Sequence, residues 1–92
     1  PWRQLPTARR KGCQVDLLLQ SERSVYVVEI KRKSAIEADI EDEMTRKIKA
    51  LALPHDISVR TALVYDGNLS PSVEARGYFD ALIPASDLLT GV

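Results

Sequence analysis

The fold class that the sequence predicts is α/β, with a mixed central sheet. Two short β-rich segments, 14–20 and 25–31, are separated by four polar residues, a length suited to a hairpin. A segment with helical periodicity follows them and precedes a further β-rich segment, 57–65. A helix between two strands can join them as parallel neighbours through a right-handed crossover. The sequence therefore predicts a β-hairpin and a β-α-β crossover within one sheet.

The hairpin strands are unusually apolar. Segment 14–20 reads QVDLLLQ and segment 25–31 reads VYVVEIK, so apolar residues occupy both faces of each strand. Strands of this kind are typical of a sheet that is covered on both faces. We expect a weaker strand over 4–10, started or interrupted by Pro6.

A single apolar stripe predicts the central helix. Its members recur every three or four residues, at Ile36, Ile40, Met44, Ile48 and Leu51. Acidic residues precede basic ones along this segment, an order that suits the helix macrodipole. Pro54 ends the predicted helix.

The C-terminal part of the chain predicts four further features. After the strand at 57–65 we expect a turn at 66–68 and a short helix at 71–78, with Ser70 as N-cap and Pro71 in its first turn. A last short strand at 82–83 and a helical turn at 86–89 complete the predicted order.

Length and composition fit one globular domain over residues 1–92. The chain is 45% hydrophobic, which argues against disorder, and its apolar runs fall short of the roughly 18 residues of a membrane span. A single cysteine excludes an internal disulfide framework and predicts a reducing, cytoplasmic setting. The chain begins at Pro1 without an initiator Met, so we expect it to be part of a longer protein.

The formal net charge of zero conceals segregated charges. Residues 1–33 carry eight basic and three acidic side chains, whereas residues 34–45 carry five acidic side chains and no basic one. The basic cluster Arg9, Arg10 and Lys11 leads into the first hairpin strand. It either forms a solvated surface or contacts the phosphates of a nucleic acid.

Charged residues in the hairpin strands indicate a site. A hairpin folded symmetrically about its four-residue connection places Asp16 opposite Glu29, and Lys31 shares a face with Glu29. Two opposed carboxylates repel unless one is protonated or a cation lies between them. Mg²⁺ or Mn²⁺ meets that need, so the pattern predicts a metal-assisted site for phosphodiester hydrolysis. The alternative is an ordinary salt bridge in which Lys31 neutralises one of the acids.

Asp16 followed thirteen residues later by Glu29-Ile30-Lys31 resembles the core motif of the PD-(D/E)XK nuclease superfamily. The resemblance implies a restriction-endonuclease-like αβββαβ core, whose first helix has no counterpart in this sequence. It also implies that Asp16 and Glu29 bind the metal ion, that the Ile30 carbonyl joins its ligands, and that Lys31 is the catalytic lysine.

The longer pattern over residues 9–90 resembles the C-terminal, nuclease-like domain of prokaryotic AAA-type ATPases. Its matching runs are 11–18, 28–31, 47–51 and 77–80. This resemblance implies an upstream ATPase domain in the same chain. No Gly-x-x-x-x-Gly-Lys-Ser/Thr sequence occurs, so these 92 residues do not contain a P-loop.

The function expected from these features is metal-dependent hydrolysis of DNA, with RNA as a less favoured substrate and no role for a membrane. The alternative is a catalytically silent nuclease fold that binds DNA or assembles with another subunit. An exposed strand edge could promote a homodimer. Lys47 could face the site from the central helix, but its spacing favours a pair with Glu43.

Overall fold

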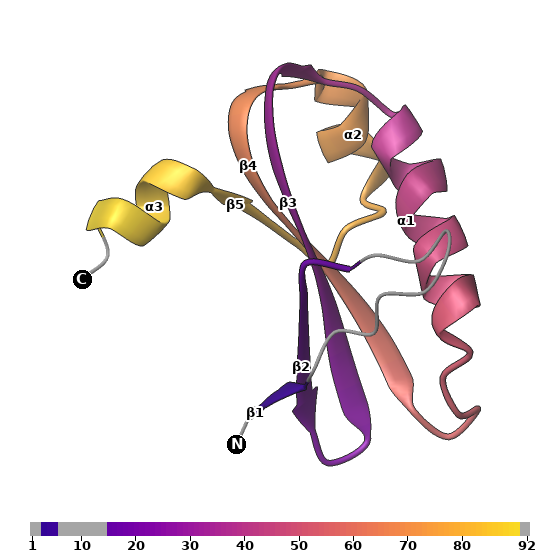
Figure 1. Cartoon of the computed structure of the whole chain (residues 1–92). Helices are drawn as coiled ribbons and strands as arrows, with labels where there is room; N and C mark the ends of the chain where they lie inside the picture. The colour runs from indigo at the N-terminus through magenta and orange to yellow at the C-terminus, as the bar shows by residue number, and fades with distance from the viewer. Residues whose placement is uncertain (1–2, 6–14, 91–92) are drawn as a thin grey trace.

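The computed structural model describes residues 3–5 and 15–90, which form a five-stranded mixed sheet with three helices (Figure 1). The strand order in the sheet is β1-β2-β3-β4-β5. In chain order the elements are β1 (Arg3–Leu5), β2 (Leu17–Ser21), β3 (Ser24–Ile36), α1 (Asp39–Leu51), β4 (Ser58–Leu69), α2 (Pro71–Arg76), β5 (Ala81–Pro84) and α3 (Ala85–Thr90). The predicted α/β class with a mixed sheet is confirmed.

The predicted hairpin and crossover are both present. β2 pairs with β3 antiparallel, and its register runs from Ser21 opposite Ser24 to Leu17 opposite Val28. This is the predicted symmetric register, closed by a two-residue loop. β3 pairs with β4 in parallel, with α1 in the connection between them. β1 adds antiparallel to β2 and β5 adds parallel to β4, so that one sheet contains both kinds of pairing.

The main core lies between α1, α2 and one face of the sheet. Figure 1 shows α1 lying along the long strands β3 and β4. Alternate residues of these strands point to this face, among them Val25, Val27 and Leu63, and pack against Met44 of α1 and Val73 of α2. All five side chains are fully buried. The apolar stripe predicted for the helix therefore does face the sheet.

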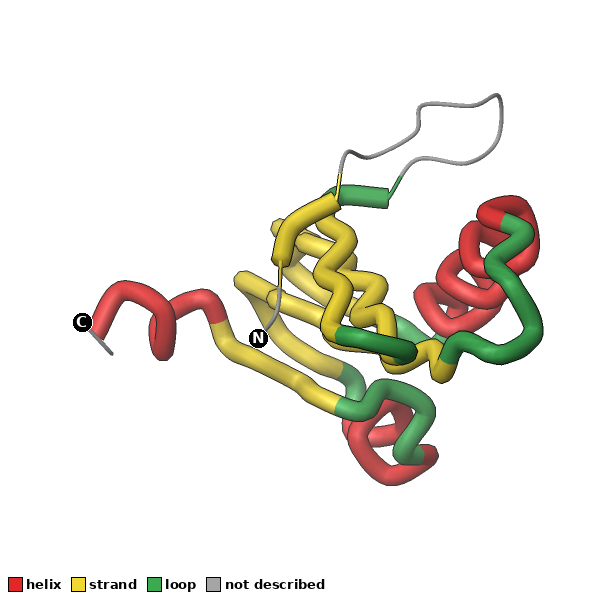
Figure 2. Tube along the Cα trace, turned by 90° about the horizontal axis from the view of Figure 1, so that it is seen from below, coloured by secondary structure: helices red, strands yellow, loops and turns green. Residues whose placement is uncertain are grey.

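The opposite face carries a smaller apolar cluster. Its buried members are Val28, Ala62 and Val64, and neither α1 nor α2 contributes to it. Figure 2 shows α1 and α3 on opposite sides of the strands. Ala85 of α3 packs against this cluster, while the Ile30 side chain is 48% exposed. Within residues 3–5 and 15–90 this face is thus covered less completely than the strand composition predicts.

Two predicted boundaries are wrong because β3 and β4 are longer than their β-rich segments. Ile36, assigned to the helical stripe, is the buried last residue of β3 and lies opposite Leu69. The predicted turn at 66–68 lies inside β4. Gly67 has φ +134° there, and a Cβ at this position would lie 1.6 Å from the carbonyl oxygen of Lys33. The pairing is irregular between Arg32 and Ala35, so a β-bulge accommodates the glycine that signalled a turn.

The remaining elements agree with the sequence to within a few residues. Ser70 occupies the N-cap position of α2 and Pro71 begins the helix, but the Ser70 hydroxyl bonds Ser72 rather than a helix amide. β1 overlaps the weak strand predicted over 4–10, and residues 6–10 lie outside the described part of the chain. The described part of the chain contains no helix with the length and hydrophobicity of a membrane span.

Candidate active site

Five charged side chains gather where the start of β2, the middle of β3 and one side of α1 meet. Asp16, Glu29 and Lys31 come from the hairpin, and Glu43 and Lys47 come from α1. Glu29 and Lys31 are two residues apart on β3, so both point toward the helix. The structure thus brings the three sequence-predicted site residues together and adds two from the crossover helix.

Asp16 directly precedes β2 and is tied to β3 through its side chain. Its Oδ2 accepts a hydrogen bond of 2.8 Å from the main-chain N–H of Ile30. The hairpin register, continued by one residue beyond Leu17, places Asp16 opposite Glu29. Burial raises the pKa of Glu29, and the negative charge of Asp16 adds to the rise, so the two carboxyl groups are close enough to interact.

Glu29 is the most deeply buried charged residue of the cluster, at 1% exposure. Its Oε2 accepts a hydrogen bond of 2.5 Å from Nζ of Lys47 and lies 3.9 Å from Nζ of Lys31. Its Oε1 is buried and has no hydrogen-bond partner. A buried carboxylate oxygen without a partner is costly, because its lost hydration is not replaced.

Glu43 connects the two lysines. Its Oε1 accepts a hydrogen bond of 3.1 Å from Lys31 and lies 3.5 Å from Nζ of Lys47, one helical turn along α1. Lys47 therefore bridges Glu29 and Glu43. The predicted pair of Lys47 with Glu43 is present. The expectation that this pair keeps Lys47 away from the site is wrong, because the closer contact of Lys47 is with Glu29.

The pKa shifts follow from burial opposed by ion pairing. Burial raises the pKa of Glu29, and the nearby Lys47 only partly offsets it. Burial acts to raise the pKa of Glu43 as well, but the hydrogen bonds and charges of Lys31 and Lys47 outweigh it and lower that pKa. Burial acts to lower the pKa of Lys47, but its contacts with Glu29 and Glu43 raise it overall. Only for Glu29 does burial win, since it is the least exposed of the three.

The donor set fits a hard divalent cation held by few protein ligands. Asp16 and Glu29 offer two carboxylates, of which Glu29 presents an oxygen with no partner. In an extended strand the N–H and C=O of one residue point the same way, so the Ile30 carbonyl faces the side of β3 where its amide meets Asp16. Within the described residues, no group of three or more His, Cys, Asp or Glu side chains could hold a metal ion. Mg²⁺ commonly uses one or two carboxylates and completes its shell with water or phosphate oxygens.

Glu43 was not identified as a site residue from the sequence, and Lys47 was considered only as the less favoured possibility. They flank the apolar stripe of α1, each directly before a stripe residue, Met44 or Ile48. This position places them at the edge of the buried helix face, where a long side chain can reach a neighbouring strand. The feature of the sequence that could have identified them is the acid-before-base pair Glu43 and Lys47 at the edge of the helix stripe, together with the acid Glu29 in an apolar strand.

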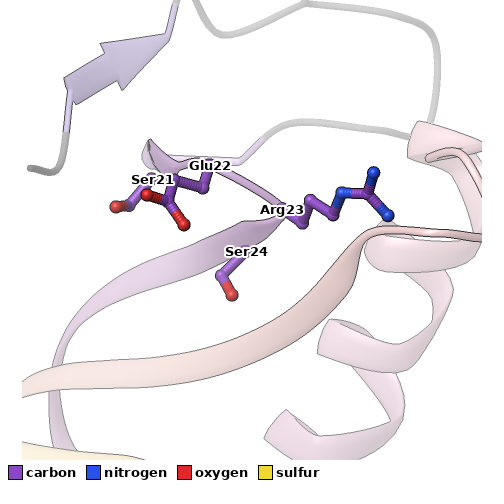
Figure 3. A pocket seen from close by; sticks show the side chains of 4 residues that line it. All are labelled: Ser21, Glu22, Arg23 and Ser24. Atoms are coloured by element: carbon purple, nitrogen blue, oxygen red, sulfur yellow. The ribbon is translucent and has the colours of Figure 1, made fainter.

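Arg9, Arg10 and Lys11 lie outside the described residues, so their predicted phosphate contacts stay a prediction. A surface hollow of about 580 Å³ lies at the hairpin turn and is lined by Ser21, Glu22, Arg23 and Ser24. Figure 3 shows these side chains pointing in different directions. The turn lies five residues before Glu29 along β3, and it gathers no catalytic set of side chains.

Comparisons of the chain with protein-family models, with curated proteins and with solved structures found no match.

Proposed function

We propose that this domain is a metal-dependent nuclease that hydrolyses phosphodiester bonds in DNA. The observation that carries the proposal is the buried carboxylate of Glu29, which lies beside Asp16 and keeps Oε1 without a hydrogen-bond partner. A structural ion pair accounts for Oε2 but not for Oε1. A bound cation would satisfy the second oxygen and remove the repulsion between the two carboxylates.

The residues divide the chemistry between them. Asp16, Glu29 and the Ile30 carbonyl would hold Mg²⁺ or Mn²⁺, which when bound supplies Lewis-acid assistance and a more acidic water. Lys31 offers an ammonium group next to the carboxylates, where it can donate to a phosphate oxygen as negative charge develops. Glu43 accepts a hydrogen bond from Lys31 and orients it from α1.

The order of elements also supports the proposal. The run β1-β2-β3-α1-β4 agrees with the restriction-endonuclease-like core that the sequence resemblance implies, apart from the first helix. Glu29 and Lys31 lie on β3 and Asp16 directly precedes β2, an arrangement that agrees with what the resemblance implies. The basic residues Arg9, Arg10 and Lys11, which precede β2 in the sequence, would contact DNA phosphates, and an upstream ATPase domain would deliver the substrate.

The experiment is cleavage of plasmid and single-stranded DNA by the whole protein in the presence of Mg²⁺ or Mn²⁺. We expect cleavage by the wild type and none by the double variant Asp16→Ala, Lys31→Ala. Asp42→Ala, which removes an exposed acid of α1, is the matched control and should cleave normally. Equal cleavage by the wild type and the double variant would refute the proposed site.

A second candidate is a catalytically silent nuclease fold that binds DNA or assembles with another subunit. One observation favours it: Lys31 and Lys47 already neutralise Oε2 of Glu29 and Oε1 of Glu43, as in a structural ion-pair network. Calorimetric titration with Mg²⁺ and Mn²⁺ separates the two candidates. Absence of binding, together with a melting temperature unchanged by EDTA, would favour the silent fold.

A further inference from the structure

The site contains more carboxylates than ammonium groups, and Lys47 provides the ammonium group nearest to the buried carboxylate of Glu29. The cluster contains three carboxylates, those of Asp16, Glu29 and Glu43, against the two ammonium groups of Lys31 and Lys47. Lys47 is the nearer cation to Glu29, with Nζ at 2.5 Å from Oε2 compared with 3.9 Å for Lys31. Lys47 therefore contributes most of the positive charge next to the buried carboxylate.

An ammonium group and a divalent cation compete for the same carboxylate. A carboxylate whose oxygen accepts a hydrogen bond from Lys47 has less negative charge to offer to a metal ion, and the ammonium group repels that ion directly. Glu29 is almost inaccessible to solvent, so water and salt screen these interactions only weakly. Competition at this residue should consequently be strong.

Lys47 also has a second acceptor within reach. Oε1 of Glu43 lies 3.5 Å from its Nζ, on the same helix and one turn toward the N-terminus. A rotation within the four-carbon side chain can move the ammonium group from Glu29 toward Glu43 without displacing α1. The ammonium group of Lys47 can therefore keep a carboxylate acceptor, Glu43, when a cation binds to Glu29.

We propose that Lys47 is a built-in counter-ion that occupies Glu29 in the metal-free protein and moves toward Glu43 when a divalent cation binds. This inference rests on the proposed function, because it concerns the same two-carboxylate site. It assigns Lys47 a positioning role, which sets the affinity of the site for the cation. It also explains how a buried, partly unpartnered carboxylate is tolerated in the metal-free fold.

The test is calorimetric titration of the whole protein with Mg²⁺ and with Mn²⁺ at a pH of about 8, well above the ordinary carboxyl pKa. Lys47→Met removes the charge but keeps an unbranched side chain, and we expect it to bind the cation more tightly, on the order of tenfold. Lys47→Arg keeps the charge and should bind like the wild type. Lys49→Met, which removes an exposed lysine of the same helix, is the control for a general charge effect and should change affinity little.

Thermal unfolding supplies a readout that does not depend on activity. Without metal, Lys47→Met should melt below the wild type, and saturating Mg²⁺ should raise its melting temperature more than it raises that of the wild type. If Lys47→Met does not fold, the wild type still tests the inference through the NMR resonances of the Lys47 side chain. Saturating Mg²⁺ should shift these resonances and leave those of Lys49 unchanged.

The outcomes separate the inference from the proposed function. Cation binding by the wild type with equal or weaker binding by Lys47→Met overturns the role of Lys47 and leaves the metal site standing. Lys47 resonances that stay unchanged at saturating cation have the same meaning. Absence of cation binding in every variant overturns the proposed metal site, and the inference with it.

Discussion

The main-chain amide of Ile30 donates a hydrogen bond of 2.8 Å to Oδ2 of Asp16, at the point where the pairing of β2 with β3 ends. The Asp16 carboxylate thus accepts the hydrogen bond of an N–H group that a main-chain carbonyl would accept if β2 continued by another residue. In this position its charge acts on the neighbouring Glu29, which lies on the same strand as Ile30. One side chain therefore closes the hairpin ladder and completes the candidate metal site.

Asp16→Asn is expected to lower the pKa of Glu29. Burial is the main cause of the raised pKa of Glu29, and the negative charge of Asp16 adds to it, so the neutral amide removes the contribution of that charge. The amide oxygen can still accept the bond from Ile30, so the fold should be retained. Carboxyl-carbon NMR titration measures the shift, with Asp42→Asn as control. A Glu29 pKa equal to that of the wild type would contradict the described contact.

Glu29→Gln is expected to stabilise the metal-free protein at neutral pH and to abolish cation binding. Because burial raises the pKa of Glu29 in the folded state, the folded protein binds this proton more tightly than the unfolded chain. That stabilisation is complete below the ordinary glutamate pKa and is lost as the pH rises through the raised pKa. The neutral amide avoids the loss. Urea unfolding at a series of pH values should show the two proteins converging at acidic pH and diverging toward neutrality, and a less stable variant at neutral pH would contradict the shift.

Gly67→Ala is expected to destabilise the sheet severely, by more than about 2 kcal/mol. The new Cβ would lie 1.6 Å from the carbonyl oxygen of Lys33, and φ of +134° is itself unfavourable for alanine. Gly77→Ala is the matched comparison, because Gly77 has φ +64° but no atom within 4 Å of the new Cβ. It should cost only about 1 kcal/mol. Equal melting temperatures for the two variants would show that Lys33 does not constrain position 67.

Met44→Ala is expected to reduce the free energy of unfolding by about 2–5 kcal/mol. Met44 is completely buried between α1 and the sheet, so its truncation leaves a cavity in the main core. Leu88→Ala on α3 is the control, since this side chain is 56% exposed and should change stability by about 0.5 kcal/mol or less. Denaturant unfolding followed by circular dichroism compares the two, and similar losses would place the main core elsewhere.

The local pattern of the chain determined the hairpin, its register and the crossover. The register followed from the short polar connection between two β-rich segments, because a two-residue loop leaves one symmetric pairing. Once that register holds, Asp16 and Glu29 must face each other, so the meeting of the two acids was predictable. The parallel pairing of β3 with β4 followed from the helix between them.

Predictions from local patterns failed where the same residues fit two different kinds of structure. Ile36 fits the helical stripe, yet it also fits an extension of β3, and pairing with Leu69 of β4 decides for the strand. Asp66-Gly67-Asn68 has the composition of a turn, yet parallel pairing with β3 and a bulge near Lys33 keep it within β4. In both cases hydrogen bonds to a distant strand override the local preference.

Strand alternation and hairpin register are local properties, so the residue pattern alone was enough to predict that two carboxylates and a lysine meet on the hairpin. That Lys47 and Glu43 belong to the same cluster, with Lys47 closer to Glu29 than Lys31 is, follows from the packing of α1 on the sheet. Lys47 and Glu29 are distant in the sequence, and they meet because core packing holds α1 against β3. The neutral total of 13 basic and 13 acidic residues gave no indication of the cluster. Burial of Glu29 beneath the helix is what turns a common strand motif into a candidate site.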